Sequence, residues 1–289
     1  MAYEIDHVDD SGSEGLAHWQ MLLKIKTFAE AHGWTTLRYT TPTDGSPREL
    51  ILHGVGLSAD KDIYIGFRTY HSVSGDYYNL SCAGFIGYVD ANAFTDQPGY
   101  YERGVCAHNL RIDYWLCVNG QRIVFGIKVG TPVYEVGYAG LFFPYATPGQ
   151  YPYPLMVAGT LNGVPGTRYS DTNDNHSSGV KGNNTNAAFR SPVGAWTAFR
   201  TLTHSDPNFN SGAIHRDCGG YYLAKKIVVI VPGDSLVAGN VWGEFDGLRY
   251  ITGFNNVVEN TTTIDGNSNV VIQDVFRTGI GDYFLLEML

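Results

Sequence analysis

The sequence has few charged residues, and the basic ones are the scarcer. Asp, Glu, Lys and Arg make up only 16% of the 289 residues, against roughly 25% in an average soluble domain. The 28 acidic residues outnumber the 19 basic ones, so the formal net charge is −9. Nucleic acids and anionic membrane surfaces are bound through Lys and Arg. We therefore expect neither a nucleic acid nor a membrane as a partner.

Long apolar runs and export signals are also missing. The longest apolar run, IVVIV at 227–231, has the length of a strand, whereas a membrane span needs about 20 apolar residues. The opening MAYEIDHVDD has neither a basic nor an apolar part, so we expect no secretory signal. Without export, N-glycosylation is not expected at the four N-x-S/T matches, which begin at Asn79, Asn175, Asn183 and Asn260.

Cysteine is scarce and scattered. The four residues are Cys82, Cys106, Cys117 and Cys218, and no two of them form a C-x-x-C pair. In a chain without an export signal, we expect them to be reduced thiols that are mostly buried.

Glycine, tyrosine and apolar residues are plentiful. The chain contains 35 Gly and 20 Tyr, and 44% of its residues are hydrophobic. This composition is typical of a globular protein built from strands, turns and extended loops. The length is sufficient for one large or two ordinary domains.

One stretch has a helical pattern. Apolar residues recur at helical spacing in the segment that follows Ser11: Met21, Leu22, Ile25, Phe28 and Ala29. Ser11 and Glu14 have the spacing of a capping box, and Gly33 provides a stop. The sequence therefore predicts an amphipathic helix of about five turns, packed on a sheet.

Most of the remaining chain has strand patterns. Runs rich in β-branched and aromatic residues cover 34–40, 49–56, 62–72, 77–89, 112–120 and 121–130. Asn119-Gly120 predicts a hairpin with a type I′ turn. A second turn is expected at 265–267. The apolar ending at 282–289 is expected to pair into a sheet or to dock on another subunit.

These patterns predict a mainly β fold with antiparallel, sandwich-like sheets, one N-terminal amphipathic helix and long irregular loops. Residues 1–160 are expected to form the helix and a β-rich body. Residues 161–219 are rich in Gly, Asn, Ser and Thr and are expected to be a polar loop excursion. Residues 220–289 are expected to be a C-terminal β segment packed on the same body.

The stretch GLFFPYATPGQYPYPLMVAGT at 140–160 is apolar and aromatic, yet it contains Pro144, Pro148, Pro152 and Pro154. A helix is excluded, and a central strand would lose hydrogen-bond donors, so we expect neither. Such a stiff segment loses little chain entropy when it docks. We favour contact with a neighbouring subunit; strapping of the protein's own sheets is the alternative.

Two stretches resemble catalytic or calcium motifs and fail at their diagnostic positions. PGDSL at 232–236 matches the signature of GDSL esterases, but no histidine follows His215 to act as the base for Ser235. DTNDNHSSG from Asp171 offers oxygens at calcium-loop spacing. His176 and Gly182 replace its required Gly and Glu.

Other candidate ligands and acids are also isolated. His215, Asp217 and Cys218 lack the paired spacing of zinc ligands. The adjacent Asp9 and Asp10, and the isolated Glu135, show no carboxylate partner. We therefore assign no catalytic, cofactor-binding or metal-binding residue, and we expect no cofactor and no enzyme activity.

Adjacent tyrosines occur at 77–78, 100–101 and 221–222. Neighbours in a strand face opposite sides, so one of each pair can pack inside while the other faces solvent or a partner. Exposed tyrosines suit protein interfaces and sugar stacking. They favour a carbohydrate-binding host-recognition module as an alternative function.

Several blocks resemble a family of tailed-bacteriophage (myophage-like) virion proteins that are tail- or baseplate-associated. FPYATPGQYPYPL is the most specific block, and the resemblance covers most of the chain outside the polar excursion. The blocks lie at 18–39, 48–70, 77–99, 114–159, 168–172, 243–254 and 271–289.

This resemblance implies a non-enzymatic structural subunit of a phage tail or baseplate. Its partners would be other virion proteins in a symmetric assembly, which extended loops would join. The chain would be located in the virion after synthesis in the cytoplasm of the bacterial host. The family brings no catalytic residues.

Overall fold

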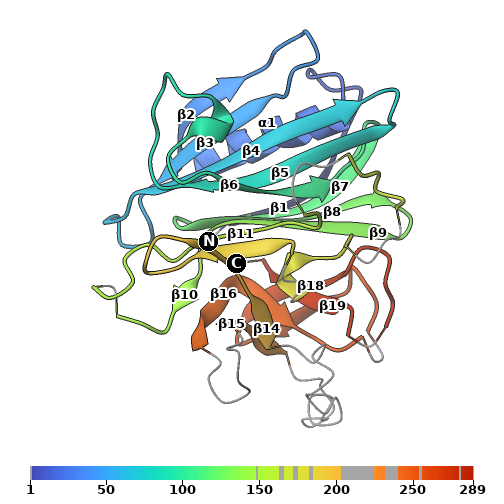
Figure 1. Cartoon of the computed structure of the whole chain (residues 1–289). Helices are drawn as coiled ribbons and strands as arrows, with labels where there is room; N and C mark the ends of the chain where they lie inside the picture. The colour runs from blue at the N-terminus through green and yellow to red at the C-terminus, as the bar shows by residue number, and fades with distance from the viewer. Residues whose placement is uncertain are drawn as a thin grey trace.

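The computed structural model describes residues 2–147, 149–162, 166–171, 175–181, 185–202, 224–231, 240–253, 256–279 and 281–288. The fold is mainly β, as the sequence predicts, with antiparallel sheets and one α-helix in the described ranges. Figure 1 shows three sheets stacked as layers, here named the N-terminal, middle and C-terminal sheets.

The N-terminal sheet is a five-stranded meander. Its strands are β2 (Thr35–Thr40), β3 (Glu49–Gly54), β4 (Ile63–Ser72), β5 (Tyr77–Phe85) and β6 (Tyr101–Cys106). The short 3-10 helix η1 (Phe94–Asp96) lies between its last two strands in the sequence. Its first four strands, β2 to β5, lie within stretches whose patterns predict strands.

The middle sheet is seven-stranded, with β1 at one edge. In spatial order its strands are β1 (Ala2–Asp9), β7 (Arg111–Val118), β8 (Arg122–Gly130), β9 (Val133–Leu141), β11 (Leu155–Ala158), β12 (Ala187–Arg190) and β13 (Trp196–Ala198). Because β11 to β13 join β1 in a single sheet, this sheet continues past residue 160, where the sequence suggests a boundary.

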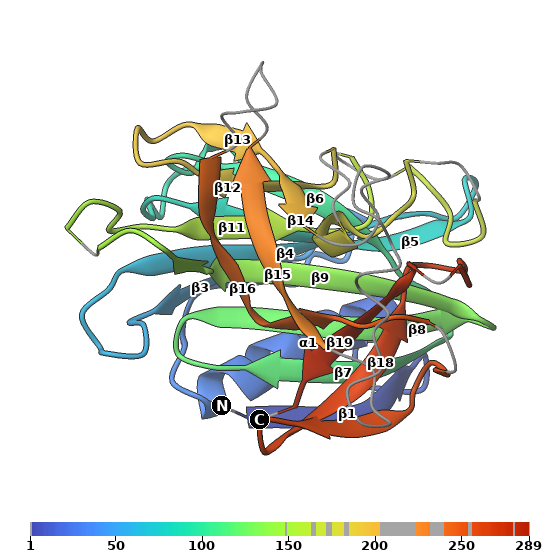
Figure 2. The same cartoon turned by 90° about the horizontal axis from the view of Figure 1, so that it is seen from below.

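The C-terminal sheet is also seven-stranded. It contains β14 (Arg200–Leu202), β15 (Lys225–Val231), β16 (Asn240–Tyr250), β19 (Tyr283–Glu287), β18 (Asn267–Gln273) and β17 (Thr261–Ile264), and β10 (Phe143–Pro144) pairs with β16. The apolar C-terminal run thus lies inside a sheet, as predicted. Figure 2 shows β15 and β16 crossing the strands of the middle sheet at a steep angle.

The central strands of the middle sheet are largely buried on both faces, because their side chains alternate between two cores. On β7, Tyr114 and Leu116 pack in the core shared with the N-terminal sheet. Trp115 and Cys117 pack in the core shared with the C-terminal sheet. A strand buried on both faces reads as a continuous apolar run, which explains the IDYWLCV pattern.

The helix α1 (Ala17–Ala31) fills the space between the N-terminal and middle sheets, and its buried face includes Met21, Leu22 and Ile25. It ends before Gly33, which has φ +92°, as predicted. The predicted capping box is wrong. Leu16 is the N-cap and makes no side-chain cap bond. Gly15, with φ +86°, has a left-handed backbone that interrupts a helix starting any earlier.

The two residues of the predicted capping box bind elsewhere. The Ser11 hydroxyl donates to Asp9 Oδ1 at 2.6 Å, and Glu14 pairs with Arg48. The helix therefore has four turns rather than five, given its 15 residues.

Both predicted turns form, but the type I′ geometry lies at the other one. β7 and β8 are an antiparallel hairpin, as predicted, yet neither Asn119 nor Gly120 has the positive φ that a type I′ turn needs. Asn119 Oδ1 instead accepts the backbone N–H groups of Gln121 and Arg122. Asp265 (φ 52°) and Gly266 (φ 85°) have the type I′ signs between β17 and β18.

Two stretches are more regular than expected. Within 161–219, the described residues include η2 (Gly179–Lys181), β12, β13 and β14, and Asn186 is fully buried. The stretch 140–160 begins with the end of β9, contains β10, and ends in β11. The polar composition of 161–219 gives no local signal for these short strands, because each forms only by pairing with a strand that the rest of the fold provides.

A buried ion pair joins the middle and C-terminal sheets. The side chain of Arg122 is fully buried, and its Nε lies 3.4 Å from Asp246 Oδ2. The side-chain amides of Asn119 and Gln121 donate hydrogen bonds to Asp246 Oδ2, at 2.7 and 2.9 Å. Gly247 beside this pair has φ +77°, which favours glycine, and a Cβ there would clash with the Arg122 guanidinium.

We expect Asp246→Ala to lower the free energy of unfolding by about 3–5 kcal/mol, because it leaves a buried guanidinium without its counter-charge. Urea unfolding followed by circular dichroism measures this change. The control is Asp113→Ala, which removes an exposed ion pair with Arg111 and should cost less than about 1 kcal/mol. Equal costs for the two variants would contradict this account of Arg122.

Candidate functional site

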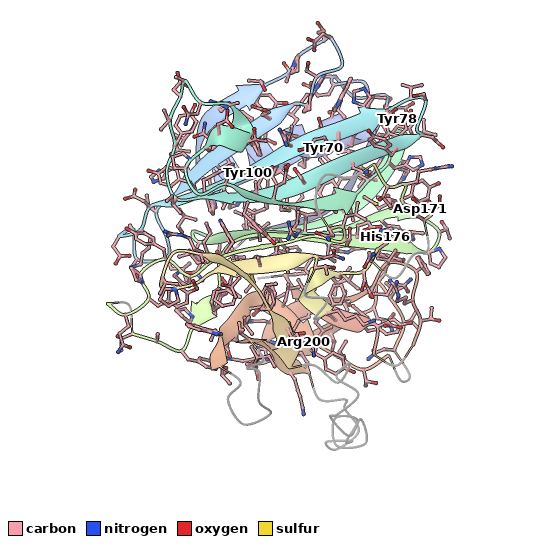
Figure 3. All side chains as sticks on the ribbon, in the orientation of Figure 1. Tyr70, Tyr78, Tyr100, Asp171, His176 and Arg200 are labelled. Atoms are coloured by element: carbon pink, nitrogen blue, oxygen red, sulfur yellow. The ribbon has the colours of Figure 1, made fainter. Side chains whose placement is uncertain are left out.

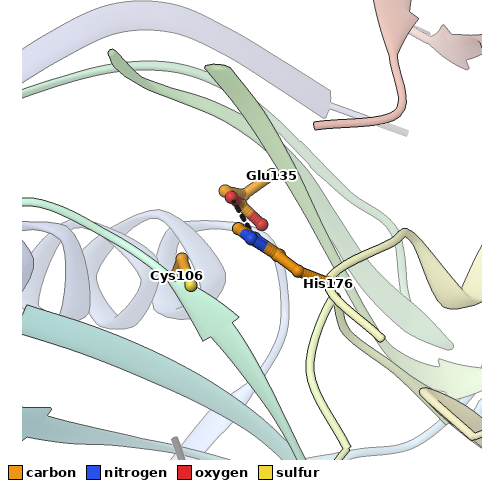
Figure 4. Close-up of side chains that lie close together, drawn as sticks. All are labelled: Cys106, Glu135 and His176. Atoms are coloured by element: carbon orange, nitrogen blue, oxygen red, sulfur yellow. Dashed lines mark hydrogen bonds and ion pairs between the residues drawn. The ribbon is translucent and has the colours of Figure 1, made fainter. Parts of the chain in front are cut away.

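Three chemically active side chains converge in the interior from distant parts of the chain. Cys106 is the last residue of β6, Glu135 lies on β9, and His176 lies in the loop 175–181 (Figure 4). Their sulfur, oxygen and nitrogen atoms all lie within 4.8 Å of one another, and all three residues are buried. The cluster therefore lies between the N-terminal and middle sheets, and the loop closes one side of it.

Hydrogen bonds fix the orientation of the His176 ring. Nδ1 lies 2.8 Å from the backbone carbonyl oxygen of Asp171, and Nε2 lies 2.7 Å from Glu135 Oε1. A carbonyl can only accept, so Nδ1 carries a hydrogen and Nε2 faces the cluster. Figure 3 shows Asp171 and His176 close together at one end of the layers.

His176 and Glu135 shift each other's pKa inside the buried cluster. Burial raises the pKa of Glu135, although His176 opposes this shift. Burial alone would lower the pKa of His176, but the Glu135 carboxylate and the hydrogen bonds outweigh it and raise this pKa to about 9. The pair is thus a buried, hydrogen-bonded acid and base.

The loop that carries His176 is itself tightly held. Asp274 is fully buried and accepts from the Ser177 hydroxyl at 2.8 Å and from the Ser178 backbone N–H at 2.6 Å. Asn186 Nδ2 donates to the Ser177 carbonyl at 2.7 Å. Arg277 Nη1 donates to the His176 carbonyl at 2.7 Å. Asp274 and Arg277, which follow β18 of the C-terminal sheet, and Asn186, which precedes β12 of the middle sheet, therefore fix the position of the imidazole.

The cluster is not arranged for nucleophilic catalysis. Burial raises the pKa of the Cys106 thiol well above its usual value, and its Sγ donates a weak hydrogen bond to the Thr167 carbonyl at 3.6 Å. A cysteine nucleophile needs a thiolate that a substrate can reach. The chemistry that the cluster does fit is metal binding, because its sulfur, nitrogen and oxygen atoms are donors of the kind that bind transition metals.

A surface pocket lies where the N-terminal and middle sheets meet at their edge. Its volume is ≈ 330 Å³, and Tyr64, Tyr153, Asp62 and Arg190 are among its lining residues. His53 Nε2 lies 2.9 Å from Asp62 Oδ1, and the His53 ring lies on that of Tyr64. The pocket therefore combines two tyrosine rings with a carboxylate and a guanidinium.

Tyr153 belongs to an aromatic segment, defined here as residues 142–147 and 149–154. Phe142 and Tyr151 are buried and anchor this segment in the core shared with the C-terminal sheet. Tyr145 N donates to the Trp242 carbonyl at 3.0 Å, and Phe142 N donates to the Pro154 carbonyl at 3.0 Å. The segment is therefore fixed at both ends and through β10.

The same segment presents apolar side chains to solvent. Phe143 is 40% exposed, Tyr145 58% and Tyr153 44%. Aromatic residues held on a fixed backbone are typical of interfaces. The buried residues strap the segment to the protein's own sheets, which is the alternative that the sequence offers; contact of the exposed residues with a neighbouring subunit stays a prediction.

The calcium-like stretch has a different use. The Asp171 carboxylate accepts the backbone N–H of Arg168 at 3.1 Å, and its carbonyl holds His176. The carbonyl of Asn175 accepts a hydrogen bond from Asn186 at 2.7 Å. Ser235 and the group His215, Asp217 and Cys218 lie outside the described residues.

The tyrosine pairs are partly as predicted. Tyr101 stacks on Trp196 beside the core of the N-terminal and middle sheets, while Tyr100 packs with Phe85 and Phe94 on the other face. Tyr77 and Tyr78 are both half-buried, so neither is fully inside. The pair at 221–222 lies outside the described residues.

In the sequence, Glu135 is an isolated acidic residue, and His176 replaces the glycine that a calcium-binding loop requires. The signal that would have joined them to Cys106 is tertiary, because each residue comes from a different strand or loop. Cys82, Cys106 and Cys117 are buried free thiols, as predicted. Cys218 lies outside the described residues.

We expect Cys82, Cys106 and Cys117 to resist iodoacetamide in the folded protein, because burial raises the pKa of each thiol, that of Cys117 to about 12. Peptide mass spectrometry should show alkylation of all three only after unfolding in urea. A Val73→Cys variant, at a position 77% exposed, is the positive control. Rapid labelling of Cys106 in the folded chain would contradict this expectation.

Comparisons with protein families and with curated proteins identify no relative of the chain. No protein-family model matches the chain, and no curated protein matches it either. No helix among the described residues is long and apolar enough to cross a membrane. The function therefore has to be inferred from the buried cluster, the pocket and the aromatic segment.

Proposed function

We propose that the chain is a structural subunit of a bacteriophage tail or baseplate and binds neighbouring virion proteins through the aromatic segment. The observation that carries this proposal is the exposure of Phe143, Tyr145 and Tyr153 on a backbone that is anchored on both sides. The segment includes all but Pro148 and Leu155 of FPYATPGQYPYPL, the most specific block of the resemblance to phage virion proteins.

Anchoring favours this role for an energetic reason. A loop that orders only on binding loses conformational entropy, which weakens the complex. Here β10 pairs with β16, and Tyr151 donates a hydrogen bond to the Arg190 carbonyl. The exposed aromatic rings are therefore held in place before a partner arrives, and each ring brings a large apolar area to the contact.

The buried cluster is consistent with a subunit that does not catalyse a reaction. Cys106, Glu135 and His176 are closed off from solvent, so no substrate reaches them in this arrangement. The other features of the chain are structural: three packed sheets and few charges. A part of a large assembly needs this kind of rigid body with a presented contact surface.

We expect the triple variant Phe143→Ala, Tyr145→Ala, Tyr153→Ala to fold but to enter phage particles at least about tenfold less, since interface hot spots contribute about 2 kcal/mol or more. Quantitative mass spectrometry of purified particles measures incorporation. The control replaces three apolar residues that are exposed elsewhere, Val73, Leu110 and Val193.

Two results would count against the proposal. Equal incorporation of the triple variant and its control would show that the aromatic segment is not the contact. Absence of the wild-type chain from purified particles would overturn the virion assignment itself.

A second candidate function is carbohydrate binding in the pocket beside the segment. Tyr64 and Tyr153 offer faces on which a sugar ring can stack, and Asp62 and Arg190 offer hydrogen bonds to its hydroxyl groups. The pocket volume of ≈ 330 Å³ is in the size range of small-ligand sites.

For this second function, the isolated chain should bind at least one sugar on a glycan array, and Arg190→Ala should weaken that binding by about tenfold, as expected for loss of one charged hydrogen bond. Arg111→Ala, which removes an exposed guanidinium outside the pocket, is the control. Binding to no glycan above background would remove this candidate, and the virion contact would stand on its own test.

A further inference from the structure

The buried cluster has a donor set that the proposed function leaves unused. Cys106 offers a sulfur atom, Glu135 two oxygen atoms, and His176 the Nε2 atom. Ligands of a tetrahedral zinc ion lie about 2.0–2.3 Å from the metal, so neighbouring donors stand between three and four ångströms apart. Donors within 4.8 Å of one another therefore need only small side-chain movements to meet at one ion.

His176 has the orientation of a metal ligand. Its Nδ1 donates to the backbone carbonyl of Asp171 at 2.8 Å, which leaves Nε2 to face Cys106 and Glu135. Metal-bound histidines are usually held by such a hydrogen bond from the ring nitrogen that does not bind the metal. The loop that supplies the histidine is fixed by Asp274 and Asn186, so the position of Nε2 is set before any ion binds.

Glu135 supplies an independent observation that points to a ligand. The residue is fully buried, and the Thr160 hydroxyl lies beside its carboxylate, but neither that hydroxyl nor Oε2 makes a hydrogen bond of normal geometry among the described residues. A buried carboxylate oxygen without a partner is costly. A cation beside the carboxylate would remove that cost, and coordination by both oxygens would make Glu135 bidentate.

We propose that Cys106, Glu135 and His176 form a structural zinc site, with Cys106 Sγ, His176 Nε2 and both oxygens of Glu135 as the donors. The proton balance of binding is simple. One Zn²⁺ replaces the thiol proton of Cys106 and the proton in the hydrogen bond between His176 and Glu135, so two protons are released to solvent. The bound site carries no net charge, because the thiolate and the carboxylate neutralise the ion.

The donor chemistry selects zinc over the common alternatives. Calcium and magnesium prefer oxygen donors and avoid thiolate. One thiolate, one imidazole and a carboxylate suit a four-coordinate transition metal, and a closed, buried site is typical of structural rather than catalytic zinc. The ion would join β6 of the N-terminal sheet to β9 of the middle sheet and to the loop 175–181.

The first test is metal analysis of the untagged full-length protein produced in zinc-supplemented medium. We expect about one zinc ion per chain by inductively coupled plasma mass spectrometry. X-ray absorption of the same sample should show one sulfur at about 2.3 Å and nitrogen or oxygen neighbours at about 2.0–2.2 Å. This measurement uses the wild-type chain, so it does not depend on whether a variant folds.

Variants then assign the ligands. Cys106→Ala, Glu135→Gln and His176→Gln should each lower the zinc content at least about tenfold, since removing one ligand weakens binding by this order or more. The matched control Cys117→Ala removes a thiol buried in the other core and should keep its zinc. Cobalt-grown protein should absorb in the thiolate-to-cobalt charge-transfer region, and Cys106→Ala should lose that band.

Three results would overturn the site. The first is wild-type protein without stoichiometric zinc, which would leave the cluster as a hydrogen-bonded His–Glu pair beside a thiol. The second is a metal shell without sulfur. The third is zinc retained by Cys106→Ala. None of these results bears on the virion contact, because the aromatic segment is tested in assembled particles.

Discussion

The packing of the middle sheet against the C-terminal sheet depends on the contact between Arg122 and Asp246. A fully buried guanidinium must have its counter-charge in place, so β16 can pack on β8 only where Asp246 reaches Arg122. Asn119 serves the same contact twice, because Oδ1 shapes the hairpin turn while Nδ2 holds Asp246. The turn therefore has a geometry set by the neighbouring layer rather than by the local Asn-Gly pair.

The same constraint explains why the middle sheet can serve two cores at once. β7, β8 and β9 give alternate side chains to the two cores, and no solvent-facing side remains to define their register. The buried polar contacts supply that definition: Arg122 and Asp246 on the C-terminal side, and Glu135 with His176 on the N-terminal side. Each is a specific pairing that a shift of one residue would break.

Much of the fold is predictable from local patterns, and the candidate site is not. The periodicity at Met21, Leu22 and Ile25 and the apolar C-terminal run act over a few residues, so the sequence suffices to predict α1 and β19. The strand β1 is missed because AYEIDHVD is charged, as befits an edge strand with little burial. Cys106, Glu135 and His176 become neighbours only through the packing of layers, which single-sequence spacing does not reveal.

The aromatic segment has a mechanical consequence. It leaves the middle sheet at β9 and returns at β11, and between them β10 is hydrogen-bonded to β16 of the C-terminal sheet. A pull on Tyr145 would therefore load two sheets together rather than peel one loop away. The Tyr145 ring, which is 58% exposed, thus lies on a connection whose two ends join the middle sheet and whose β10 pairs with the C-terminal sheet.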